Sequence, residues 1–383
     1  DQPEESALLA LEVDLLNRGN GGLAQDADVF NALRTAMGRL QPLPVLDGQF
    51  DSVLALAVMP DGHTAVAGSE DGRVVLLALD GQGQSKALGT FPAAVRAVAL
   101  RPAGDLAAAA VGRQVYLFDL RQRAVSSRLL AEGASGVTSL AFDSSGVHLA
   151  AGSLDGAVRL FDVGSDTNPA IALPGTASNR VTSVAFSPDG KTLGVAASKG
   201  GGLLWNMGSP GAVPRTVCAG IDVRSIAFAP DGKSVACGSA QGQIVRVSLG
   251  GADRPATLAG HRSSVNSLAF DHSGTSLASA SSDGSVRVWN LARPQEQAIV
   301  LPGHESWVWA VAFTPGGDRL VSGGADRKVR TWPARTEVLS RMLCGVVAGR
   351  AGQKQLTQEA WRKYMPADLA YPKDGPCVAR SGP

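Results

Sequence analysis

The sequence has few aromatic residues, few cysteines and almost no net charge. Aromatic residues make up 5% of its 383 residues, and its formal charge at pH 7 is +1. A charge this close to zero gives no long-range attraction to nucleic acid or to an anionic membrane surface. No apolar run approaches the roughly 20 residues of a membrane-spanning helix. We therefore predict neither a nucleic-acid partner nor a membrane span.

Four cysteines are too few for a disulfide scaffold. Cys218 and Cys237 lie in apolar stretches, where we predict two small buried hydrophobic side chains. Cys344 and Cys377 lie in the C-terminal stretch, which fits either a disulfide between them or two free thiols. Free thiols are typical of an intracellular protein. We expect a cytoplasmic location, with an extracytoplasmic one as the alternative if Cys344 and Cys377 form a disulfide.

Glycine, in contrast, is abundant, and strand-like segments recur between glycine-rich turns. The sequence contains 46 glycines. From about residue 42, runs of alternating apolar residues are separated by Gly, Asp, Ser and Pro, which predicts antiparallel strands joined by tight turns. The first strand of each repeat begins with a valine, and successive valines are 42 to 44 residues apart. These seven register valines are Val53, Val95, Val137, Val181, Val223, Val265 and Val308.

Seven repeats at this period predict an all-β fold, a seven-bladed β-propeller over residues 42–335, because one four-stranded unit cannot bury its apolar face alone. Residues 45–49 match residues 257–261 and 300–304, which run from the outer strand of one blade into the next. We therefore predict that residues 42–48 supply the outer strand of the last blade and close the ring.

The segments on either side of the repeats lack this alternation. Residues 1–41 predict a connector made of a helical hairpin, with helices over Ala7–Leu16 and Asp26–Gly38. For residues 336–383 we predict a C-terminal tail packed on the propeller. We expect it to be irregular over Glu337–Val347 and helical over Leu356–Tyr364. Because the sequence begins at Asp1 without an initiator methionine, we expect it to be part of a longer or processed chain.

Two repeats, Gly260–Asn290 and Gly303–Trp332, resemble the WD-repeat β-propeller family. Both begin with Gly-His, carry Ser-x-x-x-Asp before a turn and have a Trp at the end of the next strand. The tail resembles the segment that follows WD repeats in large bacterial signalling proteins, although Lys354-Gln355 replaces the usual Arg-Asn. Its matching residues are Cys344, Leu356, Thr357, Glu359, Trp361, Tyr364, Tyr371 and Cys377. The resemblance implies an effector or STAND/NACHT-type NTPase module upstream in the same full-length chain.

Two sets of His, Ser, Asp and Trp stand at identical offsets in these repeats. They are His261, Ser279, Asp283 and Trp289, and His304, Ser322, Asp326 and Trp332. A His, a Ser and an Asp invite a hydrolase interpretation, but no nucleophile elbow accompanies them. In the resembled family the four side chains form a buried hydrogen-bonded chain, which implies a structural role here. The spacing of the five histidines suits no zinc site, so we expect no metal or cofactor. Because no catalytic site stands out, we also expect no enzyme activity.

The residues beside the register valines are the candidates for binding a partner. In a propeller the first strand of each blade starts at one rim of the central channel, so these side chains project onto one face. The candidates are Arg96, Arg180, Arg224, Asn266, Trp307 and Trp309. Arginine and tryptophan are enriched at interface hot spots, which predicts a protein or peptide partner, acidic or anchored by an aromatic side chain. Alternatively, Trp307 and Trp309 pack under the tail or line the channel.

These observations favour a non-catalytic interaction or sensor module of a larger bacterial signalling or defence protein. The alternative is a free-standing scaffold for assembly of a protein complex, and a hydrolase is the third interpretation. Coding sequence upstream of Asp1 is expected for the first and not for the second.

Overall fold

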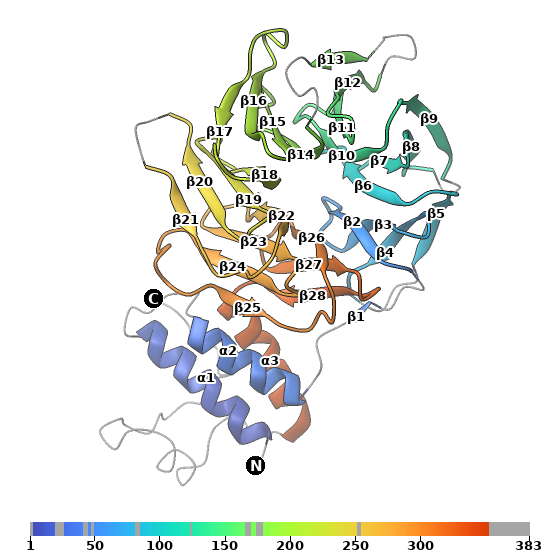
Figure 1. Cartoon of the computed structure of the whole chain (residues 1–383). Helices are drawn as coiled ribbons and strands as arrows, with labels where there is room; N and C mark the ends of the chain where they lie inside the picture. Colours follow the sequence, from blue (N-terminus) through green and yellow to red (C-terminus); the bar gives the residue numbers. More distant parts are fainter. Residues whose placement is uncertain are drawn as a thin grey trace. The chain divides into compact units, whose positions relative to one another are not determined.

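The computed structural model of the chain describes residues 3–19, 27–40, 45–46, 50–80, 85–122, 125–164, 170–173, 179–250 and 254–351. These residues form two compact units. One unit holds three helices, which come from both ends of the chain. The other is a ring of seven four-stranded antiparallel sheets (Figure 1). The predicted seven-bladed propeller is therefore confirmed.

Each blade is one sheet, numbered here in chain order. Blade 1 contains β2 (Val53–Val58), β3 (Thr64–Ser69), β4 (Arg73–Ala78) and β5 (Lys86–Thr90), and blade 2 contains β6 (Val95–Leu100), β7 (Leu106–Val111), β8 (Gln114–Asp119) and β9 (Ser127–Glu132). Blade 3 contains β10 (Val137–Phe142), β11 (His148–Ser153), β12 (Val158–Asp162) and β13 (Ile171–Leu173), and blade 4 contains β14 (Val181–Phe186), β15 (Thr192–Ala197), β16 (Gly201–Asn206) and β17 (Arg215–Val217).

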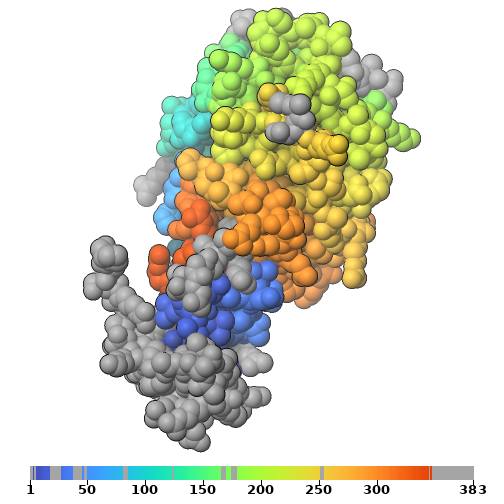
Figure 2. Space-filling model, turned by 90° about the vertical axis from the view of Figure 1, so that its left-hand side faces the viewer, coloured from blue at the N-terminus to red at the C-terminus, as the bar shows by residue number. Residues whose placement is uncertain are grey.

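The remaining blades follow the same plan. Blade 5 contains β18 (Val223–Phe228), β19 (Ser234–Ser239), β20 (Ile244–Ser248) and β21 (Ala256–Leu258), and blade 6 contains β22 (Val265–Phe270), β23 (Ser276–Ser281), β24 (Val286–Asn290) and β25 (Ile299–Leu301). Blade 7 contains β26 (Val308–Phe313), β27 (Arg319–Gly324), β28 (Val329–Pro333) and, from the beginning of the chain, β1 (Val45–Leu46). Figure 2 shows blades 4, 5 and 6, from light green through yellow to orange, packed in sequence order.

The ring closes through strand β1. Val45 pairs with Arg330 and Leu46 with Val329, in antiparallel register. The beginning of the ring therefore supplies the outer strand of its last blade, which is the closure that the sequence predicts, and no blade is left with an incomplete sheet.

Neighbouring blades pack through the register valines. All seven are at most 4% exposed. Each meets the second strand of the preceding blade, where a glycine or alanine makes room. A Cβ atom added to Gly323 would lie 2.6 Å from Cγ1 of Val53, and one added to Gly68 would lie 2.5 Å from Cγ1 of Val95. These small residues are therefore required by the close approach of the blades.

A β-bulge follows every register valine. The pairing of the first and second strands skips one residue at the same place in all seven blades. The extra residue of a bulge is unpaired, and its side chain is re-aimed relative to a regular strand. The seven bulge residues are Leu54, Arg96, Thr138, Thr182, Arg224, Asn266 and Trp309.

The helical unit consists of α1 (Pro3–Gly19), α2 (Ala27–Leu40) and α3 (Thr336–Ala351). Helices α1 and α2 correspond to the predicted hairpin, and α3 packs on both of them. Leu339 and Leu343 of α3 are fully buried, one helical turn apart. Ser340 Oγ donates to Asp14 Oδ2 over 2.5 Å, which links α3 to α1.

Helix α3 shows that the prediction of an irregular segment over Glu337–Val347 was wrong. That stretch is apolar on most sides, so it carries no clear period, but tertiary contacts with α1 and α2 stabilise it as a helix. The predicted helix Leu356–Tyr364 lies outside the described residues. The boundaries 1–41, 42–335 and 336–383, and the packing of the tail on the propeller, stay predictions.

We predict that Gly323→Ala lowers the free energy of unfolding by about 1–3 kcal/mol, because the added methyl group collides with Val53 at the closure of the ring. Chemical denaturation would measure the change. Gly211→Ala is the matched control, since nothing lies within 4 Å of a Cβ atom added there. Equal stability of both variants and the parent would show that the contact between blades tolerates a side chain.

Candidate functional site

Three bulge residues tie one blade to the next. Thr138 Oγ1 donates to the carbonyl of Val181 over 2.7 Å, and Thr182 Oγ1 donates to the carbonyl of Val223 over 3.0 Å. Asn266 Nδ2 makes the same kind of bond to the carbonyl of Val308, at 2.9 Å. The structure thus gives Asn266 a structural role that differs from the partner-binding role predicted from sequence. The repeated use of Thr or Asn at one register position is the signal that could have shown it.

Serines one position further along the strand add a second set of ties. The backbone N–H of Val184 donates to Ser139 Oγ over 2.9 Å, and that of Ile226 donates to Ser183 Oγ over 3.4 Å. Ser225 Oγ donates to the carbonyl of Val265 over 2.9 Å. Blades 1, 2 and 7 have alanine at this position, and alanine cannot make this bond. Side-chain hydrogen bonds of this kind therefore connect blade 3 through to blade 7.

The remaining polar bulge residues are arginines, and with a third arginine they form an arginine cluster of Arg96, Arg180 and Arg224. Arg96 and Arg224 are the bulge residues of blades 2 and 5, and Arg180 immediately precedes the register valine of blade 4. Arg224 Nη2 donates to Asp222 Oδ2 over 3.1 Å. Burial and the positive charges of Arg224 and Arg96 lower the pKa of Arg180. The charges of Arg96 and Arg224 therefore both act on Arg180.

Two polar atoms of this region are left without a partner among the described residues. They are Arg224 Nε and Asp222 Oδ1, both buried. A buried donor without a partner costs about 1–3 kcal/mol relative to a satisfied one. The arginine cluster is therefore a place where the described part of the protein leaves one donor, Arg224 Nε, and one acceptor, Asp222 Oδ1, without a partner.

Trp307 and Trp309 form a tryptophan pair at the start of blade 7. Trp307 precedes the register valine and is 54% exposed, and Trp309 is the bulge residue. Their rings meet edge to face, with centroids 5.5 Å apart and an angle of 88° between the planes. Trp309 Nε1 is buried without a hydrogen-bond partner among the described residues. An exposed indole beside an unsatisfied one is typical of a surface that receives a partner.

The first His–Ser–Asp–Trp set is a connected chain of hydrogen bonds. His261 Nδ1 lies 2.9 Å from Asp283 Oδ2, and His261 Nε2 lies 2.7 Å from Ser279 Oγ. Trp289 Nε1 donates to the same Ser279 Oγ over 2.8 Å. Burial raises the pKa of Asp283, but hydrogen bonds from His261, Ser285 and the backbone of Arg262 outweigh it and hold this pKa well below its usual range.

The second set repeats this geometry in blade 7. His304 Nδ1 lies 2.9 Å from Asp326 Oδ1, and His304 Nε2 lies 2.8 Å from Ser322 Oγ. Trp332 at the end of β28 is buried. Ser279 and Ser322 are fully buried, so neither hydroxyl could reach a substrate. The geometry supports the structural interpretation of both sets and disfavours the hydrolase.

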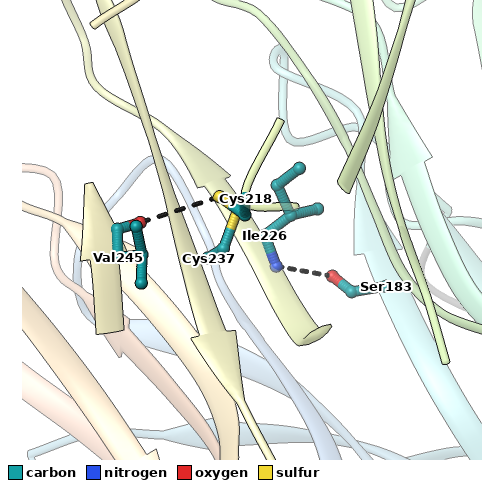
Figure 3. The surroundings of a disulfide bond; sticks show 5 residues. All are labelled: Ser183, Cys218, Ile226, Cys237 and Val245. Carbon is teal, nitrogen blue, oxygen red and sulfur yellow. Dashed lines mark hydrogen bonds between the residues drawn. A yellow bond between two sulfur atoms is a disulfide. The ribbon is translucent and has the colours of Figure 1, made fainter. Parts of the chain in front are cut away.

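Cys218 and Cys237 form a disulfide, so the prediction of two separate buried thiols was wrong. Cys218 follows β17, the last strand of blade 4, whereas Cys237 lies in β19 of blade 5, and their Cα atoms are 6.5 Å apart. Figure 3 shows the bond beside Ile226, whose N–H reaches Ser183 of blade 4. The two cysteines are 19 residues apart in the sequence, and only the packing of blade 5 on blade 4 brings them together. Their spacing alone therefore does not predict the bond.

Cys344 is also disulfide-bonded. Cys377 lies outside the described residues, so the predicted pairing of Cys344 with Cys377 stays a prediction. Among the residues that the structure describes, no group of three or more His, Cys, Asp or Glu side chains could hold a metal ion. In the same part of the chain, no helix is long and apolar enough to cross a membrane.

Removing the disulfide between blades by Cys218→Ser/Cys237→Ser is predicted to lower the free energy of unfolding by about 3 kcal/mol, since the bond closes a loop of about 19 residues in the unfolded chain. Thermal denaturation of the variant and the parent, both without reductant, would measure this. Rapid labelling of Cys218 or Cys237 by a thiol reagent in the unfolded, unreduced parent would show that the bond does not form.

The burial of His304 predicts a pH dependence of stability. Desolvation lowers the pKa of His304 below its usual value, despite the opposing effect of Asp326. In the unfolded chain this histidine therefore binds a proton at a higher pH, near 6.5, so the free energy of unfolding falls as the pH drops below about 6.5. Tm measured at about pH 7.5 and pH 5.5 should change less in His304→Gln than in the parent or in the exposed-site control His272→Gln. The same pH dependence in all three proteins would contradict this account.

Comparison with known proteins places the chain in a family. The family described as "WD domain, G-beta repeat" matches it over residues 40–76, 127–162, 168–206, 214–245, 253–290 and 295–333, which together make up more than half of the chain. The inner strands of blade 2 fall between two matches; the hairpin joining β7 and β8 there is reduced to Gly112-Arg113 and lacks the usual turn aspartate.

The chain is also similar to the "Periodic tryptophan protein 2 homolog" of Schizosaccharomyces pombe (strain 972 / ATCC 24843). The two are 37% identical over 114 residues, which is 29% of this chain and 13% of that protein. The chain therefore spans only a small part of the length of this relative. With seven four-stranded blades in its structure and family matches over six of them, the chain belongs to the WD domain, G-beta repeat family.

Proposed function

We propose that this chain is a non-catalytic recognition module that binds a protein or peptide partner on the face formed by its bulge residues. The observation that carries the proposal is the arginine cluster and the tryptophan pair, placed at matching register positions of four different blades. Both residue types are among those most enriched at interface hot spots. Propellers of this family typically serve protein interaction, which supports the proposal at the level of the fold.

The finer form of the proposal makes this propeller the sensor end of a larger bacterial signalling or defence protein. Its support is the resemblance of the tail to the segment that follows WD repeats in such proteins. The helical unit adds to it, because α1 and α2 from the beginning of the chain and α3 from beyond the ring pack together. In this proposal, a partner on the ring changes the restraint on an upstream effector or NTPase module through these helices.

The disulfide between Cys218 and Cys237 favours the second candidate function, an assembly scaffold in an oxidising compartment. Structural disulfides persist in extracytoplasmic proteins and are rare in the cytoplasm. A nucleotide-hydrolysing effector works where nucleotide is supplied, in the cytoplasm. The extracytoplasmic location therefore accompanies the scaffold function, whereas the sensor function with an NTPase module requires the cytoplasmic one.

The predicted result of the combined change Arg180→Ala/Trp307→Ala/Trp309→Ala is the loss of partner binding without a change in Tm. A partner would first be captured with the parent protein from the source organism, identified and purified, and its Kd then measured. Removing three hot-spot side chains should weaken binding at least a hundredfold, or roughly 3 kcal/mol.

The matched control for this experiment is Leu129→Ala/Ile171→Ala, which removes exposed apolar side chains from the outer strands β9 and β13. The control should bind like the parent. Unchanged binding by the triple variant, together with loss of binding by the control, would place the partner on the outer edge of the blades and overturn the proposal.

A further inference from the structure

We propose that the arginine cluster is a binding site for the carboxylates of an acidic peptide segment. The inference rests on the proposed function and assigns the chemistry of the partner that the ring face receives.

Each of the three arginines lies directly beside a register valine. Arg96 and Arg224 are both bulge residues, so their side chains leave the innermost strands at the same level of the ring. Arg180 lies one residue before Val181, at the start of the innermost strand of blade 4. Strands β14 and β18 are neighbours. Arg180 and Arg224 therefore stand on the two sides of the junction between blades 4 and 5.

The arginine cluster contains more positive charges than paired carboxylates. Arg224 is paired with Asp222, whereas Arg96 and Arg180 have no carboxylate partner among the described residues. Of the three guanidinium groups, only that of Arg224 is therefore paired with a carboxylate among the described residues. Guanidinium groups remain charged at neutral pH, so the free protein bears their mutual repulsion. Carboxylates bound between them would relieve this repulsion through the exposed part of the Arg224 side chain, which is 35% exposed.

The junction between blades 4 and 5 is held by two hydrogen bonds and a disulfide. Thr182 Oγ1 of blade 4 donates to the carbonyl of Val223, the residue before Arg224. Ser183 accepts from Ile226, and the disulfide joins Cys218 to Cys237, which pairs with Ile226 across the sheet (Figure 3). Three links therefore fix the strands that carry Arg180 and Arg224. A preorganised pair of donors loses little conformational entropy when it binds.

The spread of the cluster favours a peptide over a single small anion. Its arginines belong to blades 2, 4 and 5, and three guanidinium groups together offer more N–H donors than one carboxylate or phosphate can accept. An extended segment with several Asp or Glu side chains presents carboxylates at intervals along its length. Such a segment can also continue towards the tryptophan pair of blade 7, where an apolar side chain would bind.

The experiment measures binding of a fluorescein-labelled hexaglutamate peptide to the full chain by fluorescence anisotropy at about 0.15 M salt, where weak long-range attraction is screened. Arg180→Gln and Arg96→Gln should each weaken binding at least tenfold. The control is Lys233→Gln, which removes an equal charge from an exposed turn at the other end of the first hairpin of blade 5. It should change Kd less than twofold, and no variant should have a lower Tm than the parent.

Equal weakening by Lys233→Gln and the two arginine variants would overturn the proposal, because it would show attraction to net charge alone. Tight, Arg180-dependent binding of tripolyphosphate with no binding of hexaglutamate would also overturn it, by showing a phosphate site. If hexaglutamate does not bind but the purified partner still requires Trp307 and Trp309, the acidic assignment is wrong and the proposed function stands. If partner binding requires neither the tryptophans nor the arginines, the proposed function itself fails.

Discussion

The contact between a register valine and a small residue of the preceding blade is the constraint on which the rest of the structure depends. It recurs at every junction and leaves no space for a side chain at Gly68 or Gly323. In every blade the residue immediately after this valine is a bulge residue. The bulge side chains then either tie the next blade, as Thr138 and Thr182 do, or remain available for a partner. Packing and, in the proposed function, recognition thus depend on adjacent residues of the same strand.

Much of the fold could be predicted from the sequence because the same pattern of strands and turns recurs in seven repeats. The spacing of the valines, and the likeness of residues 45–49 to the two later segments, were enough to predict the blades and the closure of the ring through β1. Helix α3 could not be predicted in the same way. Its apolar residues lie on most sides of the helix, and its stability comes from α1 and α2, which are more than 290 residues away in the sequence.

The candidate site, too, could be predicted from the sequence only in part. The register valines predicted the positions of Arg96, Arg180, Arg224 and the tryptophan pair, at or beside the start of the innermost strands. The same pattern could not distinguish Asn266, whose Nδ2 donates to the carbonyl of Val308. The disulfide was missed for a related reason. Cys218 and Cys237 meet only because the end of one blade lies beside the second strand of the next. Contacts between repeats, unlike those within a repeat, leave little trace in the spacing of residues along the chain.

The central claim is that the bulge face of the ring, held by the ties between blades, is the surface that recognises a partner. Hydrogen–deuterium exchange of the chain with and without its purified partner tests this most directly. The account predicts slower exchange on binding in segments 94–97, 179–182, 221–225 and 306–310, with no change in the outer strands β9, β13 and β17. Protection confined to those outer strands, or to the helices α1 and α2, would contradict it.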